Sequence, residues 1–107
     1  MASKLHFTDL AIADLQRRWE YLDEVAGPEI ADSDHFKIVD FCQTLLSTAE
    51  SRSVRQDIAA GCRLAFYDKR IVVAYRVIRG HVEVVAVYSS RQDYESRLQA
   101  PARWSND

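Results

Sequence analysis

Hydrophobic residues change their spacing along the chain, and this change predicts a helical first half and a strand-rich second half. Leu5 and Phe7 alternate with polar neighbours, which is the pattern of a short strand. Thr8 then suits the N-cap of a helix, whose apolar stripe recurs at spacings of three and four. The residues of this stripe are Ile12, Leu15, Trp19 and Leu22. Asp14 lies largely off the stripe, so we expect the stripe, and not Asp14, to face the core.

A second helix is predicted directly after the first. Gly27 ends the first helix, and Pro28 is tolerated at the first position of the next, although Ser33 and Asp34 offer a later start. The apolar stripe of this helix contains His35, Ile38, Val39, Cys42, Leu45 and Leu46. Because the connection is so short, the two helices should form an antiparallel hairpin. On such a face His35 is expected to pack and not to act as a catalytic base.

The second half reads as a sheet. A polar connector, residues 47–61, leads to it, with one helical turn expected around residues 54–58. Two runs rich in Val, Ile and Tyr, residues 70–78 and 81–88, follow the run of residues 63–67, and the three together predict an antiparallel meander. Asp68-Lys69 and Arg79-Gly80 are short enough to be hairpin turns. The predicted fold class is α+β, with an N-terminal strand and a two-helix hairpin packed on a three- to four-stranded antiparallel sheet.

The last stretch predicts a short helix over residues 93–98, which Pro101 prevents from continuing. Trp104 is unusual in a solvated tail, and the sequence leaves open whether it docks on the domain or waits for a partner. With 107 residues the chain is expected to be one domain, 1–107, with a core over about 5–98 and a tail over 99–107.

Charge is distributed unevenly. Residues 1–51 carry four basic and ten acidic side chains, whereas residues 52–107 carry ten basic and six acidic ones, for an overall net charge of −2. The basic half indicates either an acidic partner or sheet edges protected by charge. The overall acidity argues against a general or sequence-specific nucleic-acid binder. No apolar run is long enough for a membrane span and no secretory signal is evident, so the expected location is the cytoplasm.

Catalytic fingerprints are absent from the sequence. It contains no GxSxG, no HExxH and no glycine-rich phosphate loop, and His6, His35 and His81 are scattered. Cys42 and Cys62 lack the spacing of metal ligands and are expected to be reduced, packed thiols. We therefore expect no cofactor, no metal and no catalytic residue, and we favour a protein that acts by binding.

Several segments together resemble one family. They are Ala13-Asp14-Leu15, Trp19-Glu20-Tyr21-Leu22, Gly27-Pro28-Glu29 with Ala31 and Phe36, Gly61-Cys62-Arg63, Arg70 to Val77, and Arg91-Gln92-Asp93. Their order and spacing over about residues 5–98 are similar to the ParE/RelE toxin superfamily of type II toxin–antitoxin systems, and closer to its ParE branch. The connector departs from the pattern because it lacks the usual proline, and Ser33-Asp34 looks like a small insertion.

The resemblance implies a plasmid-stabilisation or growth-arrest toxin that a cognate ParD-like antitoxin neutralises in a hetero-oligomer. In the ParE branch the implied target is DNA gyrase, which is poisoned so that replication stops. RelE-like relatives instead cut mRNA in the ribosome, and Tyr88 or Tyr94 would mimic their tyrosine. Of the basic residues that such chemistry needs, only Arg63 is present on the second-strand segment. A non-toxic relative that only binds its antitoxin is the third alternative.

Within this resemblance we expect partner contacts, and no catalysis, from a set of basic, aromatic and acidic side chains. The candidates are Arg63, Arg76, Tyr88, Arg91, Asp93, Tyr94, Arg97 and Trp104. Arg63 and Arg76 have the alternative of serving the scaffold, and Arg91 and Asp93 the alternative of a local ion pair. Trp and Arg are favoured anchors of interfaces, which is why the tail is included.

Overall fold

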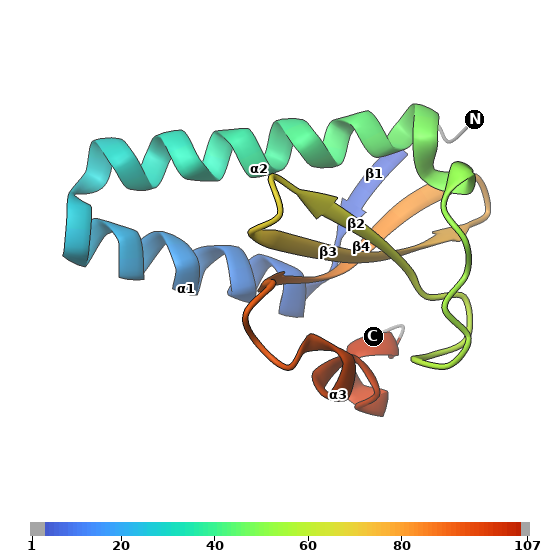
Figure 1. The fold of residues 1–107 in the computed structure, drawn as a ribbon. Coiled ribbons are helices and arrows are strands. Elements are labelled where there is room, and N and C mark those ends of the chain that lie inside the picture. The colour runs from blue at the N-terminus through green and yellow to red at the C-terminus, as the bar shows by residue number, and fades with distance from the viewer. Residues whose placement is uncertain (1–3, 106–107) are drawn as a thin grey trace.

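The computed structural model describes residues 4–105. The chain forms strand β1 (Lys4–Phe7), helix α1 (Asp9–Ala26), helix α2 (Pro28–Thr48), the 3-10 turn η1 (Ala49–Ser51), strands β2 (Arg63–Tyr67), β3 (Ile71–Ile78) and β4 (His81–Ser89), helix α3 (Tyr94–Leu98) and the 3-10 turn η2 (Pro101–Trp104). The predicted α+β architecture is confirmed: a helical hairpin covers the sheet and projects beyond its end (Figure 1). In the described part of the chain, no helix combines the length and apolarity that a bilayer crossing requires.

Local chemistry fixes the helix ends where the sequence predicts them. The Thr8 hydroxyl accepts a hydrogen bond from the Ala11 amide at 3.2 Å, so Thr8 is the N-cap of α1. Gly27 adopts a φ of 95°, which side chains disfavour, and its amide donates to the Asp23 carbonyl at 2.9 Å. α2 begins at Pro28, which excludes the later start at Ser33 and Asp34.

The sheet has the order β1-β4-β3-β2. β2, β3 and β4 form the predicted antiparallel meander, and both of its turns place their residues at positive φ, as tight hairpins require. β1 differs from the expectation because it pairs with β4 in parallel, with Lys4 opposite His81 and Phe7 opposite Val84. The two helices separate β1 from the meander, and a long helical connection permits a parallel pair, which a hairpin turn does not.

Both faces of the sheet are covered, so residues 71–75 of β3 and 84–88 of β4 are buried one after another and do not alternate with exposed residues. The hairpin side holds the first core cluster: Ala11, Leu15, Ile38, Cys42, Leu45, Ala49, Ala65, Ile71, Val73, Tyr75, Val82, Val84 and Val87. The connector and the C-terminal segment cover the other face over a second cluster: Ile58, Cys62, Leu64, Val72, Ala74, Val85, Ala86, Tyr88 and Leu98. α3 accordingly lies away from the hairpin in Figure 1.

Two details of the helical half differ from the sequence pattern. α1 buries Ala11, Asp14 and Leu15, whereas Ile12, which belongs to the predicted apolar stripe, is 50% exposed. The buried face of α1 is therefore rotated from the predicted stripe, and Ile12 lies at the exposed edge of that face. α2 also continues to Thr48, one residue beyond the predicted start of the connector. Within the connector a single helical turn is present, because the Ala59 amide donates to the Arg55 carbonyl.

Both cysteines are buried free thiols, one in each core cluster. Burial raises the pKa of Cys42 to about 12 and that of Cys62 to about 11, because a thiolate loses its hydration in these sites. The folded state therefore holds these protons more tightly than the unfolded state does. The stability that this contributes is fully present below the ordinary thiol pKa of about 8.5 and declines as the pH rises above it.

We expect both thiols to resist Ellman's reagent at pH 8 in the native protein, because thiolate and access are both lacking. They should react only as fast as the chain unfolds, and at once in concentrated guanidinium chloride. Time-resolved absorbance measures this directly. Titration of either thiol within seconds in the native protein would contradict the packing described for it.

Candidate functional site

An apolar groove of about 770 Å3 opens between β1, α1 and α2. Its lining residues are Leu5, His6, Phe7, Asp9, Ile12, Leu15, Gln16, Trp19, Asp32, His35 and Val39. Each helix presents its lining side chains at spacings of three, four and seven, so these side chains form one row along that helix. An open apolar surface with a polar rim is typical of a protein-docking site.

The groove's aromatic and polar members are held in position. The Trp19 indole nitrogen donates to the Asp32 carboxylate at 2.8 Å, which ties α1 to α2 at the rim. The His35 ring contacts Phe36 edge-on, with ring centroids 5.7 Å apart. His35 thus lines the groove and is half-buried. A fixed indole and an exposed Ile12 on the wall of the same groove give a partner a preformed place for its own apolar side chains.

On the other side of α1, Asp14 occupies the position where β1 stops pairing. β1 ends opposite Val84, and Val85 is an extra residue in β4 where the register to β3 shifts. The Val87 amide, left without a strand partner on this edge, donates to the Asp14 carboxylate at 3.0 Å. Asp14, expected to lie off the buried face, thus replaces a missing strand.

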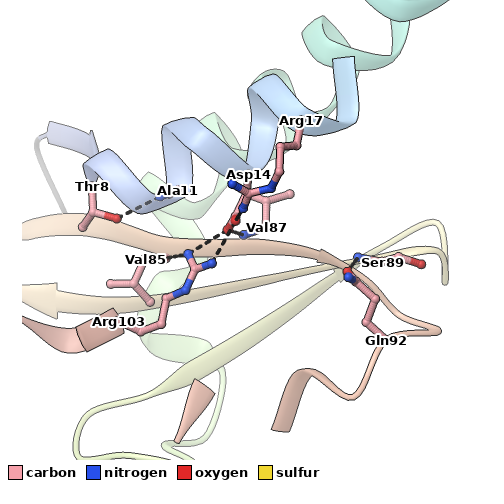
Figure 2. Close-up of polar contacts among 9 residues, drawn as sticks. All are labelled: Thr8, Ala11, Asp14, Arg17, Val85, Val87, Ser89, Gln92 and Arg103. Atoms are coloured by element: carbon pink, nitrogen blue, oxygen red, sulfur yellow. Dashed lines mark hydrogen bonds and ion pairs between the residues drawn. The ribbon is translucent and has the colours of Figure 1, made fainter. Parts of the chain in front are cut away.

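The C-terminal turn η2 is fastened to this carboxylate. Two nitrogens of Arg103 donate to the two oxygens of Asp14 at 2.8 and 2.9 Å, and one of them also donates to the Val85 carbonyl at 3.1 Å. Figure 2 shows Arg103 reaching across β4 to Asp14, with Arg17 approaching from the helix side. The Arg103 guanidinium also lies over the Tyr88 ring, 4.9 Å from its centroid. The ion pair and its carbonyl contact therefore connect α1, β4 and the tail.

Trp104 docks on the domain, which resolves the alternative that the sequence left open. Its indole nitrogen donates to the Leu98 carbonyl at 2.6 Å, and its ring packs on the second core cluster. Arg76 binds Glu83 at 2.7 Å, donates to the Trp104 carbonyl at 3.2 Å and lies over the Trp104 ring. Arg76 and Trp104, both candidates for partner contacts, are thus brought together.

The other candidates are distributed over the connector and the end of the sheet. Arg63 donates to the carbonyls of Glu50 and Arg52, so it fastens the connector to β2. Asp93 caps α3 by accepting from the Ser96 amide at 3.4 Å. Tyr94 meets the exposed ring of Phe66 edge-on, Arg97 lies over the Tyr88 ring, and Arg91 is exposed. Tyr88, Arg97 and Gln92 line a small hollow beside Asp14 and Arg17.

Tyr88 is poorly suited to proton transfer. The side chain is buried in the second core cluster, and desolvation raises the pKa of Tyr88 above its ordinary value. A phenol of raised pKa stays protonated at neutral pH and is a poor general base. The surroundings of Tyr88 therefore do not favour a role as a general base.

Comparison with protein families identifies the chain. A family model described as the ParE toxin of the type II toxin-antitoxin system, parDE, matches residues 5–94. The chain belongs to this family. A chain of the chromosomal ParDE TA system from P. aeruginosa has the same fold, with a TM-score of 0.72 and 22% sequence identity over 80% of this chain and 94% of that one. No curated protein matches the chain.

Membership of the ParE family confirms the resemblance inferred from the sequence motifs. The family match ends at Tyr94, so Leu98, Arg103 and Trp104 lie beyond it. The motif reasoning missed the pairing of Asp14 with Arg103, although Asp14 belonged to one of the recognised segments. The available sequence signal was that Asp14 lies in a predicted helix between the small residue Ala11, three positions earlier, and the apolar residue Leu15, one position later.

Proposed function

We propose that the chain is the toxin of a type II toxin–antitoxin module and that a ParD-like antitoxin neutralises it in a hetero-oligomer. The groove between β1, α1 and α2 is the observation that carries the second part of the proposal. It offers apolar walls on two helices and an edge strand, which fits an amphipathic helix or extended segment. We place this complex in the cytoplasm, where the proposed target acts.

We further propose DNA gyrase as the target, inhibited by occupation and without chemistry of the toxin's own. Membership of the ParE family supports this choice. Two contacts support it over RNA cleavage. Arg63 is engaged with the connector carbonyls of Glu50 and Arg52, and Tyr88 is packed beneath Arg103 with a raised pKa.

A supercoiling assay with purified gyrase tests the target. We expect the toxin to inhibit supercoiling and to trap cleaved DNA, and we expect prior incubation with the cognate antitoxin to abolish both effects. Unchanged supercoiling without a trapped cleavage complex would contradict the proposal. Codon-linked mRNA cuts in a cell-free translation reaction would favour the ribonuclease alternative. A chain that binds its antitoxin but leaves growth unaffected on induction would be an inert relative.

A further inference from the structure

A second hollow, separate from the apolar groove, lies between α1, the end of β4 and α3. It measures about 290 Å3, and its walls include Asp14, Arg17, Tyr88, Gln92 and Arg97. Arg17 and Ile12 are five positions apart on α1, which places them on different faces of the helix. A ligand in this hollow therefore meets a different surface from one in the groove.

Positive charge exceeds negative charge in this hollow. Arg18, which also lines it, is matched by Asp34 through two hydrogen bonds of 2.7 and 3.0 Å. Asp14 is matched by the two bonds from Arg103. The guanidinium groups of Arg17 and Arg97 are the cations that remain, and within residues 4–105 Arg97 forms no ion pair with a carboxylate.

Arg17 is available to a ligand. Its side chain is 64% exposed, and its bond to Asp14, at 2.5 Å, is one of four that this carboxylate accepts. Arg103 and the Val87 amide supply the other three, so Asp14 stays satisfied when Arg17 turns away. Gln92 accepts the Ser89 amide through its side-chain oxygen at 2.9 Å, which leaves its amino group as a donor (Figure 2). The hollow thus presents donors suited to an anion.

An apolar strip continues from the hollow along α1. Tyr21 and Val25 follow Arg17 at intervals of four, which places all three in one row. Tyr21 and Val25 are 63% and 58% exposed. Both belong to the C-terminal half of α1, and this end of the hairpin projects beyond the sheet (Figure 1). Glu20 and Glu24 flank this row and would repel any ligand that carries many negative charges, whether a nucleic acid or a highly acidic peptide. The combination selects a ligand with few carboxylates beside apolar side chains.

We propose that this surface is a second docking site, which takes an acidic amphipathic peptide segment of a protein partner. A Glu or Asp carboxylate of the segment enters the hollow between Arg17 and Arg97, and its apolar side chains cover Tyr21 and Val25. The site is independent of the antitoxin groove, so both can be occupied at once.

Fluorescence anisotropy tests this with a labelled peptide of leucine and alanine that carries few glutamates and is about 20 residues long, because much shorter isolated helices are marginal in water. The Arg17→Gln, Arg97→Gln double variant should bind it at least about tenfold more weakly, as expected when charge-assisted hydrogen bonds are lost. Tyr21→Ser should also weaken binding. Arg79→Gln, which removes an exposed arginine outside the hollow, should bind like the wild type. Thermal melting followed by circular dichroism shows that each variant is folded.

Three results would overturn the proposal. One is equal affinity for the peptide and for a version in which glutamine replaces every glutamate, because binding in the hollow would then not depend on the charge of the ligand. A second is preference for a single-stranded oligonucleotide over the peptide. The third is loss of peptide binding in Ile12→Glu but not in the arginine double variant, because the peptide would then occupy the apolar groove.

Discussion

Replacing Asp14 with alanine is expected to lower the free energy of unfolding by about 3–5 kcal/mol, the range for breaking one partner of a buried ion pair. The Asp14 side chain is 2% exposed and that of Arg103 is 12% exposed, so the guanidinium would stay in a desolvated site without its carboxylate. The Val87 amide would lose its acceptor as well. The substitution therefore removes the contact that holds α1, β4 and the tail together.

Urea denaturation followed by circular dichroism measures this loss. Glu20→Ala is the matched control, because it removes an exposed carboxylate from the same helix, and it should change stability by less than about 0.5 kcal/mol. The double variant Asp14→Leu, Arg103→Met should recover much of the loss, since apolar groups replace a buried pair at little cost. A loss below about 1 kcal/mol for Asp14→Ala would show that the pair is solvated in solution.

Ile12→Glu is expected to weaken antitoxin binding at least about a hundredfold, which corresponds to roughly 2.7 kcal/mol. Ile12 is half exposed in the free protein, so the fold tolerates a carboxylate there. In the complex the same carboxylate would be buried against an apolar segment without a partner, beside Asp9 and Asp32 on the groove wall. This prediction rests on the proposal that the antitoxin occupies the groove.

Isothermal titration calorimetry with the cognate antitoxin measures the effect. Leu10→Glu adds the same charge to the same helix at a position that is 41% exposed and outside the groove. The control should bind the antitoxin nearly as tightly as the wild type. Equal weakening by both substitutions would point to a general charge effect and would remove the groove from the proposed interface.

The fold could be predicted from the sequence because its elements are specified locally. Thr8, Gly27 and Pro28 mark the helix ends, and Arg79-Gly80 marks a hairpin turn. The orientation of each face was harder. Ala11 is small and was not counted in the apolar stripe, yet it is fully buried on the face that α1 turns to the sheet.

The candidate site was less predictable than the fold. Several of the proposed contact residues, among them Arg76, Tyr88, Arg97 and Trp104, gather on the tail side of the sheet, but their role in binding stays a prediction. The groove could not be predicted from the sequence, because residues of β1, α1 and α2 form it together. The apolar residues of each element alone have the pattern of a face that packs on the core. A stripe shows which side chains share a face, not whether a neighbour covers it.

The sequence by itself determined the element order, the helix caps, the meander and the family, because periodicity, turn chemistry and motif spacing are local properties of the chain. Only the tertiary structure decided that β1 pairs in parallel, that Ile12 is open while Asp14 is buried, and that the tail is fastened. Asp14 and Arg103 are 89 residues apart along the chain. An acid and a base at such a separation have no local signature, and only packing brings them to the same strand edge.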